Sequence, residues 1–270
     1  MPRRVEVTLA ELTAGQWGLC TAPQAQDAGI SRMQLTRLTQ AGVLQRLAHG
    51  VYALHGAGTD DRLELRAAWL GLDPARTAND RLGDGPAGTV VSHSSAADLY
   101  GFGDLDADHH EFTVPKRQQT RRRDIRLHRG VLPDNDVTVL NGLPVTKPER
   151  TVVDLLKAGH DGEHVAGVLA DAVRTRSIDV GQLGARLAPF AARFDFAVND
   201  GQGLLDHLLE LGGAADQVLA DDLVQLARAG NSSLAEWAAL GNQLAGRIST
   251  PTFTSGPPEH EEPAREPGNR

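Results

Sequence analysis

The stretch TAPQAQDAGISRMQLTRLTQAGVLQRLAHGVYAL, residues 21–54, carries the densest set of local structure signals in the chain. Its first half predicts two short helices, residues 22–28 and 31–40, on either side of Gly29, because glycine favours the left-handed end of a helix. Ser31 is the expected N-cap of the second helix, and Gln34 three residues later completes a capping box. The pattern therefore predicts a helix-turn-helix unit.

A hairpin is expected directly after the second helix. Gly42 ends that helix, and the apolar segments 43–48 and 51–54 are joined at His49-Gly50. A two-residue connection with glycine second predicts a primed hairpin turn. Upstream, residues 5–19 predict one more helix, with inward-facing side chains at Leu9, Leu12, Trp17 and Leu19. This order of elements predicts a winged helix-turn-helix domain over residues 1–56.

The second helix of this domain has one apolar and one polar face. Leu35, Leu38 and Ala41 have the spacing of an inward stripe. The other face presents side chains that can reach phosphates and base edges in a major groove. We predict DNA contacts in the groove and at the wing from the following residues: Arg32, Thr36, Arg37, Gln40, Arg46 and His49. The alternative is a helical pair and hairpin that binds protein or completes a core.

The net charge of −8 argues at first against a nucleic-acid partner. Its distribution removes the objection: residues 195–270 contain twelve Asp and Glu and four Arg, whereas residues 1–194 contain 23 of each sign. A neutral front with local basic clusters is compatible with DNA binding, because only the docking face must be positive.

Length and composition limit the class of protein. A chain of 270 residues, 40% of them hydrophobic, can bury one large or two smaller cores. It has no apolar run of eighteen residues and no secretory signal, so we expect no membrane partner. The single Cys20 excludes an internal disulfide and is expected to be a small buried hydrophobe. These features favour a cytoplasmic protein.

The rest of the chain predicts a mixed α/β domain with a helical end, over residues 57–248, so the fold class is α+β. Gly56–Gly58 is the expected linker. Short alternating strands follow, with Asn141-Gly142 as a second hairpin signal, and the periodicity becomes helical after Gly162. Residues 249–270 are rich in Pro and Glu and are expected to be disordered.

A dense basic patch lies in the second domain. Within fourteen residues seven cations accompany a single acidic residue, Asp124. The basic patch comprises Lys116, Arg117, Arg121, Arg122, Arg123, Arg126 and Arg129. Such a patch suits a polyanion or an acidic partner, because clustered like charges repel one another. The alternative is a solvated hairpin tip. Lys147 and Arg150 could likewise line a site at a helix start, where Glu149 otherwise simply suits the helix dipole.

The other polar clusters predict no catalytic, metal or cofactor site. The acidic run that begins at Asp104 resembles a calcium loop but has His109 and Pro115 where glycine and glutamate are needed. Ser92 and His93 lack a nucleophile elbow, and Ser92 is expected to cap a helix. Lysine occurs only at 116, 147 and 157, so no later residue supplies the lysine of a metal-dependent nuclease. We therefore expect no enzyme.

Several stretches together resemble the antitoxins of the AbiEi type, which belong to type IV toxin–antitoxin systems. The stretch GISRMQLTRLTQAGVLQRLAHGVYAL resembles their winged-helix domain, and VVSHSSAADLYGF, HHEFTVP and GLPVTKPERTVVDLL resemble their second domain. The resemblance covers residues 7–158, and more loosely the helices to about residue 210. It implies binding to inverted repeats in the protein's own promoter, autorepression, and action against a toxin with a nucleotidyltransferase fold.

Two other functions stay open from the residues alone. One is a winged-helix transcription regulator with a ligand-sensing or oligomerisation domain and no toxin partner. The other is an enzyme that uses the acidic loop, with Asp106 and His110 as the residues to test.

Overall fold

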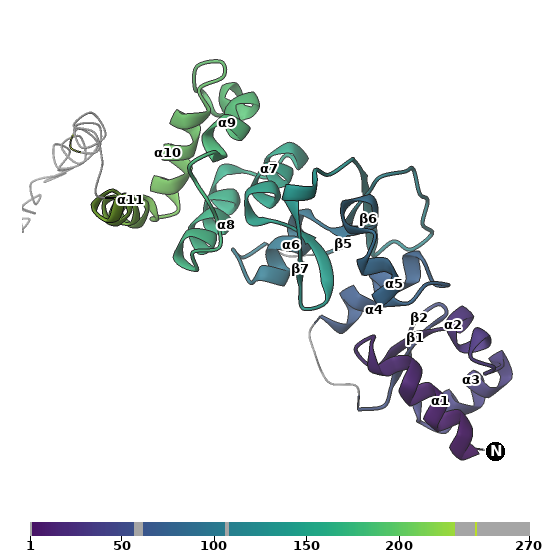
Figure 1. Cartoon of the computed structure of the whole chain (residues 1–270). Helices are drawn as coiled ribbons and strands as arrows, with labels where there is room; N and C mark the ends of the chain where they lie inside the picture. The colour runs from purple at the N-terminus through teal and green to yellow at the C-terminus, as the bar shows by residue number, and fades with distance from the viewer. Residues whose placement is uncertain (1, 57–61, 106–107, 230–240, 242–270) are drawn as a thin grey trace, which may run out of the picture. The chain divides into compact units, whose positions relative to one another are not determined.

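The computed structural model describes residues 2–56, 62–105, 108–229 and 241 (Figure 1). The described residues up to 218 form one compact unit, and those from 219 onward belong to a second. The fold is α+β, as expected. The predicted tail and Ala57-Gly58 of the predicted linker lie outside the described residues, and the boundaries 1–56, 57–248 and 249–270 stay predictions. No helix among the described residues is long and apolar enough to cross a membrane.

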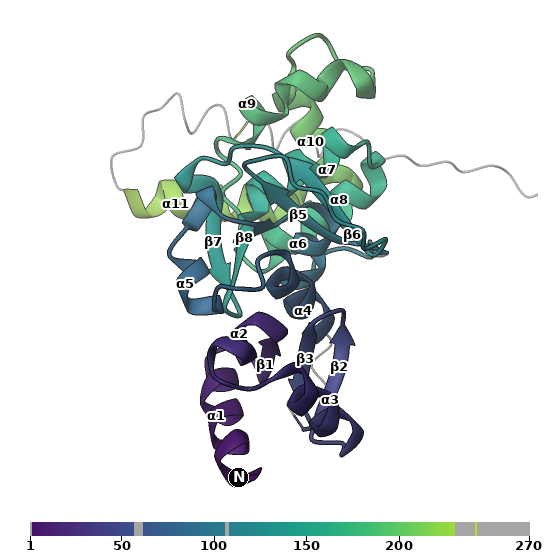
Figure 2. The ribbon, with the colours of Figure 1, turned by 90° about the vertical axis from the view of Figure 1, so that its right-hand side faces the viewer.

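The N-terminal region is a winged helix-turn-helix with a three-stranded sheet of order β1-β3-β2 (Figure 2). Its elements are α1 (Pro2–Ala14), β1 (Leu19–Thr21), α2 (Ala22–Asp27), α3 (Arg32–Gln40), β2 (Leu44–Ala48) and β3 (Val51–Leu54). The predicted first helix, residues 5–19, was too long. The backbone has positive φ at Trp17 and Gly18, and Leu19 then pairs with Ala53 of β3 instead of continuing the helix.

The predicted helix ends are confirmed. The Ser31 hydroxyl accepts a bond from the Gln34 amide, and the Gln34 side chain accepts one from the Ser31 amide at 2.8 Å. Gly29 and Gly42 have φ of 82° and 72°. A capping box between Thr21 and Gln24 at the start of α2 was not predicted. Ala41 was wrongly placed on the inward stripe: it follows the end of α3 and is exposed.

The two predicted hairpins differ at their turns. Asn141 and Gly142 both have positive φ, 53° and 81°, as a type I′ turn requires. In the wing only Gly50 has positive φ, so the predicted primed turn at His49-Gly50 is wrong. A register shift between Arg46 and Ala48 gives this hairpin an irregularity that a primed turn does not need.

The second region contains a five-stranded sheet of order β6-β5-β4-β8-β7. Its strands are β4 (Val90–Val91), β5 (His110–Val114), β6 (Ile125–Arg129), β7 (Val137–Leu140) and β8 (Leu143–Thr146). The pairs β5–β6 and β4–β8 are parallel, and the others are antiparallel. Helices precede or connect these strands in the chain: α4 (Leu63–Leu72), α5 (Ala78–Leu82), η1 (Gly85–Ala87), α6 (His93–Tyr100) and η2 (Asp134–Asp136).

A helical layer follows the sheet, as the periodicity after Gly162 predicted. It consists of α7 (Pro148–Ala158), α8 (Gly162–Arg174), α9 (Leu183–Leu187), η3 (Ala188–Phe194) and α10 (Gly201–Leu211). The last helix, α11 (Ala215–Ala229), begins in the first unit and continues past residue 218 into the second. Buried leucines and valines of α7, α8, α9 and α10 form one hydrophobic core with Ala97 and Phe102. Much of the apolar area that stabilises this region is therefore buried between helices.

The winged helix and the second region share a core. Leu19, Val51 and Ala53 pack in one cluster with Leu65 and Trp69 of α4. Polar bonds cross the same junction: Gln16 Oε1 accepts from the Ala78 amide at 2.9 Å, and Gln24 Nε2 donates to the Arg76 carbonyl at 2.7 Å. The Trp17 indole donates to the Asn141 carbonyl at 3.1 Å. These contacts join the two regions into one compact unit.

Candidate functional sites

The outer face of α3 is a candidate nucleic-acid interface. Leu35 is 1% exposed and anchors the helix, while the four predicted groove residues Arg32, Thr36, Arg37 and Gln40 are all exposed. Met33, on the same face, is 64% exposed. The capping box at Ser31 fixes the start of this helix. A rigid helix with an exposed polar face can enter a major groove and contact bases and phosphates.

The two predicted wing residues lie together at the tip of the β2–β3 hairpin. A guanidinium nitrogen of Arg46 lies 3.0 Å from His49 Nδ1, and Arg46 Nε donates to the Ala48 carbonyl. Both side chains are exposed. The wing therefore presents one positive group whose position is fixed by local hydrogen bonds.

The basic patch, residues 116–129, connects β5 to β6 and continues along β6. Six of its seven cations are exposed, the exception being Arg122, which pairs with Asp124 and is half-buried. Lys116 and Arg117 also line a pocket of about 380 Å³ with Arg76 and Arg81. The patch is a concentrated positive surface that can neutralise phosphates or acidic side chains.

Lys147 and Arg150, at the start of α7, have different surroundings. Lys147 is the half-buried N-cap of α7. Arg150 instead belongs to a buried ion-pair network. It bonds Asp136 at 3.1 Å and Asp154 at 2.8 Å, and Asp136 also binds Arg186 at 2.9 Å. Arg150 therefore links η2, α7 and α9 through carboxylates, and it also lines a second pocket.

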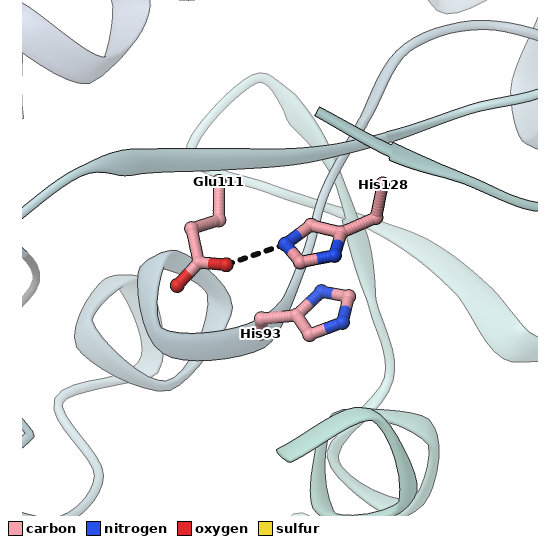
Figure 3. A group of neighbouring side chains, drawn as sticks. All are labelled: His93, Glu111 and His128. Atoms are coloured by element: carbon pink, nitrogen blue, oxygen red, sulfur yellow. Dashed lines mark hydrogen bonds and ion pairs between the residues drawn. The ribbon is translucent and has the colours of Figure 1, made fainter. Parts of the chain in front are cut away.

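Three side chains that the sequence analysis did not connect meet beside β5. They are His93, the first residue of α6, Glu111 of β5 and His128 of β6 (Figure 3). His128 Nε2 bonds Glu111 Oε2 at 2.5 Å, and the rings of His93 and His128 stack with centroids 3.6 Å apart. We call this group the His–Glu cluster.

Burial and neighbouring charges set the protonation of the His–Glu cluster. Burial, assisted by the charge of His128, lowers the pKa of His93 to about 3, so its imidazole is neutral. Burial alone would raise the pKa of Glu111, but the hydrogen bond from His128 lowers it on balance. The cluster therefore holds a carboxylate and a neutral imidazole.

A pocket of about 350 Å³ opens beside the His–Glu cluster. Its walls include His93, His128, Arg150, Asp154 and Lys157. Asp154 is 2% exposed, and its Oδ2 has no hydrogen-bond partner among the described residues. Burial raises the pKa of this carboxyl, although Arg150 opposes the shift. The pocket thus combines cations with an unused acceptor.

The His–Glu cluster was missed because its members are far apart in sequence. The prediction of no metal site was drawn from residues 104–111 alone, and Asp106 lies outside the described residues. Ser92 was expected to cap a helix, but it occupies the N-cap position without a side-chain capping bond and bonds His93 and Thr113 instead. Alternation in β5 was the available signal, because Glu111 and Thr113 share a face and Thr113 lies opposite His128.

A capped helix-turn-helix with an exposed polar face, followed by a wing, defines the N-terminal region as that of a winged-helix regulator. Comparison with family models agrees. Residues 7–55 match the family described as "Transcriptional regulator, AbiEi antitoxin", and residues 87–182 match the "AbiEi antitoxin C-terminal domain". The two matches together cover more than half of the chain, which belongs to the AbiEi antitoxin family. A search of curated proteins found no match.

Proposed function

We propose that this protein represses its own promoter and counters a nucleotidyltransferase-like toxin, as the cytoplasmic antitoxin of a type IV toxin–antitoxin system. Family membership supports the antitoxin and DNA-binding regulator roles. The observation that carries the promoter-binding part is the exposed polar face of α3, held by a buried Leu35 and a capped start. In this proposal the protein acts by binding and has no catalytic activity.

Promoter binding would place α3 in the major groove, with one protein copy on each half of an inverted repeat. Arg32 and Arg37 supply the cations, Thr36 and Gln40 supply neutral hydrogen-bonding groups, and Arg46 with His49 contacts the adjacent backbone. The net negative charge of residues 195–270 does not oppose this docking when the bound face is neutral or positive.

A gel-shift titration with the promoter fragment tests the DNA contact. Arg37→Ala should weaken specific binding by about 1–3 kcal/mol, which is the value of a good base contact. Arg174→Ala is the matched control, because Arg174 is an exposed arginine of α8 that pairs with Asp171. Equal affinity of wild type and Arg37→Ala would contradict the proposed role of α3.

Growth rescue tests the antitoxin part separately. Co-expression with the nucleotidyltransferase-like protein from the neighbouring reading frame should restore growth. Arg37→Ala should rescue as well as wild type, because the DNA-reading face lies outside the residues that match the antitoxin C-terminal domain. Failure of wild type to rescue would remove the antitoxin part and leave the promoter part standing.

The role of the basic patch follows from the same two assays. Replacing Arg121, Arg123 and Arg126 by alanine removes three exposed cations. If the patch extends the DNA footprint, the salt dependence of binding falls by about 0.9 in log–log slope for each lost phosphate contact. Loss of growth rescue with unchanged DNA binding would assign the patch to the toxin.

A further inference from the structure

The His–Glu cluster brings three metal-ligand types together from three elements. His93 begins α6, Glu111 lies in β5 and His128 lies in the neighbouring parallel strand β6. One ligand atom from each lies within 4.8 Å of the others, and Figure 3 shows the His93 ring stacked against His128, which bonds Glu111. Two imidazoles with one carboxylate are a donor set that zinc and related transition metals use in proteins.

The surroundings keep these donors ready for a metal. Nδ1 of His93 bonds Ser92 Oγ at 2.9 Å, and Ser92 Oγ in turn accepts from Thr113 Oγ1 at 2.9 Å. This chain of bonds holds the His93 ring in place, as outer partners of metal-binding histidines do.

The backbone at His93 is a separate sign of constraint. His93 has φ of 55° although it is neither glycine nor asparagine, and the residue is only 5% exposed. Such conformations persist where the surrounding structure holds them, and they gather at functional sites. The left-handed turn between β4 and α6 is what brings the His93 ring over His128.

The adjoining pocket supplies access and a free acceptor. It is lined by His93 and His128 and also by Asp154, whose buried Oδ2 has no partner among the described residues. A zinc site with three protein ligands keeps a fourth position for water or a ligand. Water at that position would have Asp154 nearby as an acceptor for its hydrogen.

We propose that His93, Glu111 and His128 bind one divalent transition-metal ion of the zinc class, with its open coordination position facing the pocket beside Asp154. This inference goes beyond repression and toxin neutralisation, and neither depends on it. An ion shared by both imidazoles lies in the plane of each ring. Because the rings are stacked at 15° to one another, binding turns at least one ring and replaces the His128–Glu111 hydrogen bond.

The test is a metal titration of the full-length protein after treatment with a chelator. Zn²⁺ binding is followed by calorimetry, and Co²⁺ binding by the visible absorption that a low-symmetry nitrogen and oxygen site produces. We expect one ion per chain in wild type. No binding, or only weak binding of several ions, would overturn the proposal without any variant.

Two variants locate the site. His93→Asn removes the imidazole but retains a residue that tolerates positive φ, and Glu111→Gln keeps the side-chain shape. Loss of an outer hydrogen-bond partner of a metal ligand weakens metal binding by roughly 10–100-fold. Loss of a ligand itself, in either variant, should weaken Zn²⁺ binding by at least as much. His207→Ala, at an exposed histidine of α10, is the control and should bind normally. Unchanged binding by Glu111→Gln with a native circular-dichroism spectrum would refute the assignment.

Discussion

The winged helix and the second region place their charged side chains differently. From α1 to β3 the buried polar side chains among the described residues are Thr13, Gln16, Thr21 and Gln24, all uncharged. The second region buries charged or titratable side chains instead: Arg66, Arg81, His93, Glu111, Asp136 and Asp154. The first region keeps its charges for an external partner, whereas the second uses them inside the fold.

This difference predicts how each region responds to substitution. Exposed charges can be removed with little effect on stability, so their loss reports on binding. Buried charges are coupled to their partners, so removing one leaves another desolvated and unpaired. The following predictions test this contrast in order of expected size.

Asp136→Ala should cause the largest loss of stability. Asp136 is 5% exposed and accepts bonds from both Arg150 and Arg186. We expect the free energy of unfolding to fall by about 3 kcal/mol, which is at the low end for breaking a buried ion pair. The loss is limited because Arg150 still pairs with Asp154 and Arg186 is partly exposed. The free energy of unfolding in urea measures this. Asp134→Ala, at an exposed neighbour, should change little, and equal effects would contradict the contrast.

Gly142→Ala should cost more than Gly29→Ala, although both glycines have φ near 80°. A Cβ at Gly142 would lie 3.0 Å from the Trp17 ring, whereas a Cβ at Gly29 would meet nothing within 4 Å. Left-handed strain costs about 1 kcal/mol at either position, and the clash adds about 1–2 kcal/mol at Gly142. Urea unfolding of both variants gives the difference. Equal losses of stability in the two variants would mean that Trp17 can move away from the added Cβ at no cost.

Ser31→Ala should cost about 1 kcal/mol through loss of the N-cap of α3. Thr36→Ala on the exposed face of the same helix should be near neutral, because alanine has the higher helix propensity. Thermal unfolding of the two variants compares them. A larger effect of Thr36→Ala would mean that the predicted DNA-reading face also stabilises the fold.

The smallest effect is a pH dependence at the start of α8. The hydrogen bond that His164 donates to Asp161 raises the pKa of His164 above 6.5, with Asp104 and Glu163 contributing. Bonds to the His164 backbone and side chain lower the pKa of Asp161 below 3.8. The contribution of His164 to the free energy of unfolding is complete below pH 6.5 and is lost as pH rises through the pKa of His164 in the folded protein. The contribution of Asp161 is present above pH 3.8 and is lost as pH falls through its folded pKa.

Melting temperatures of His164→Ala and wild type at two pH values test this expectation. The variant should melt slightly lower at pH 5, where the pair is charged, and the difference should shrink at pH 8. Both side chains are exposed, so the effect is small. A larger difference at pH 8 would contradict the assigned pKa directions.

Local signals accounted for most of the winged helix and for little of the second region's interior. Ser31 with Gln34 and Asn141 with Gly142 are close in sequence, so their residue types alone specified a capping box and a type I′ turn. The prediction for the wing turn was wrong because the irregular pairing at Arg46 depends on the neighbouring strand. His93, Glu111 and His128 meet only after β5 and β6 pair in parallel, which depends on the whole sheet.

The candidate DNA residues were recoverable from sequence because one helix presents them. Arg32, Thr36 and Arg37 share a face whenever α3 forms, and their exposure follows from the burial of Leu35 on the other side. The role of Arg150 was not recoverable, since its partner Asp136 lies fourteen residues earlier and Arg186 comes from a later helix.

The reactivity of the chain's one thiol can report how often the winged helix opens. Cys20 lies in β1, is fully buried, and has its pKa raised by burial to about 11. Thiol reagents attack the thiolate, so the closed protein resists them through both access and protonation. The rate of alkylation therefore measures how often the strand is exposed to solvent. Following it with and without promoter DNA would show whether the bound winged helix opens more slowly.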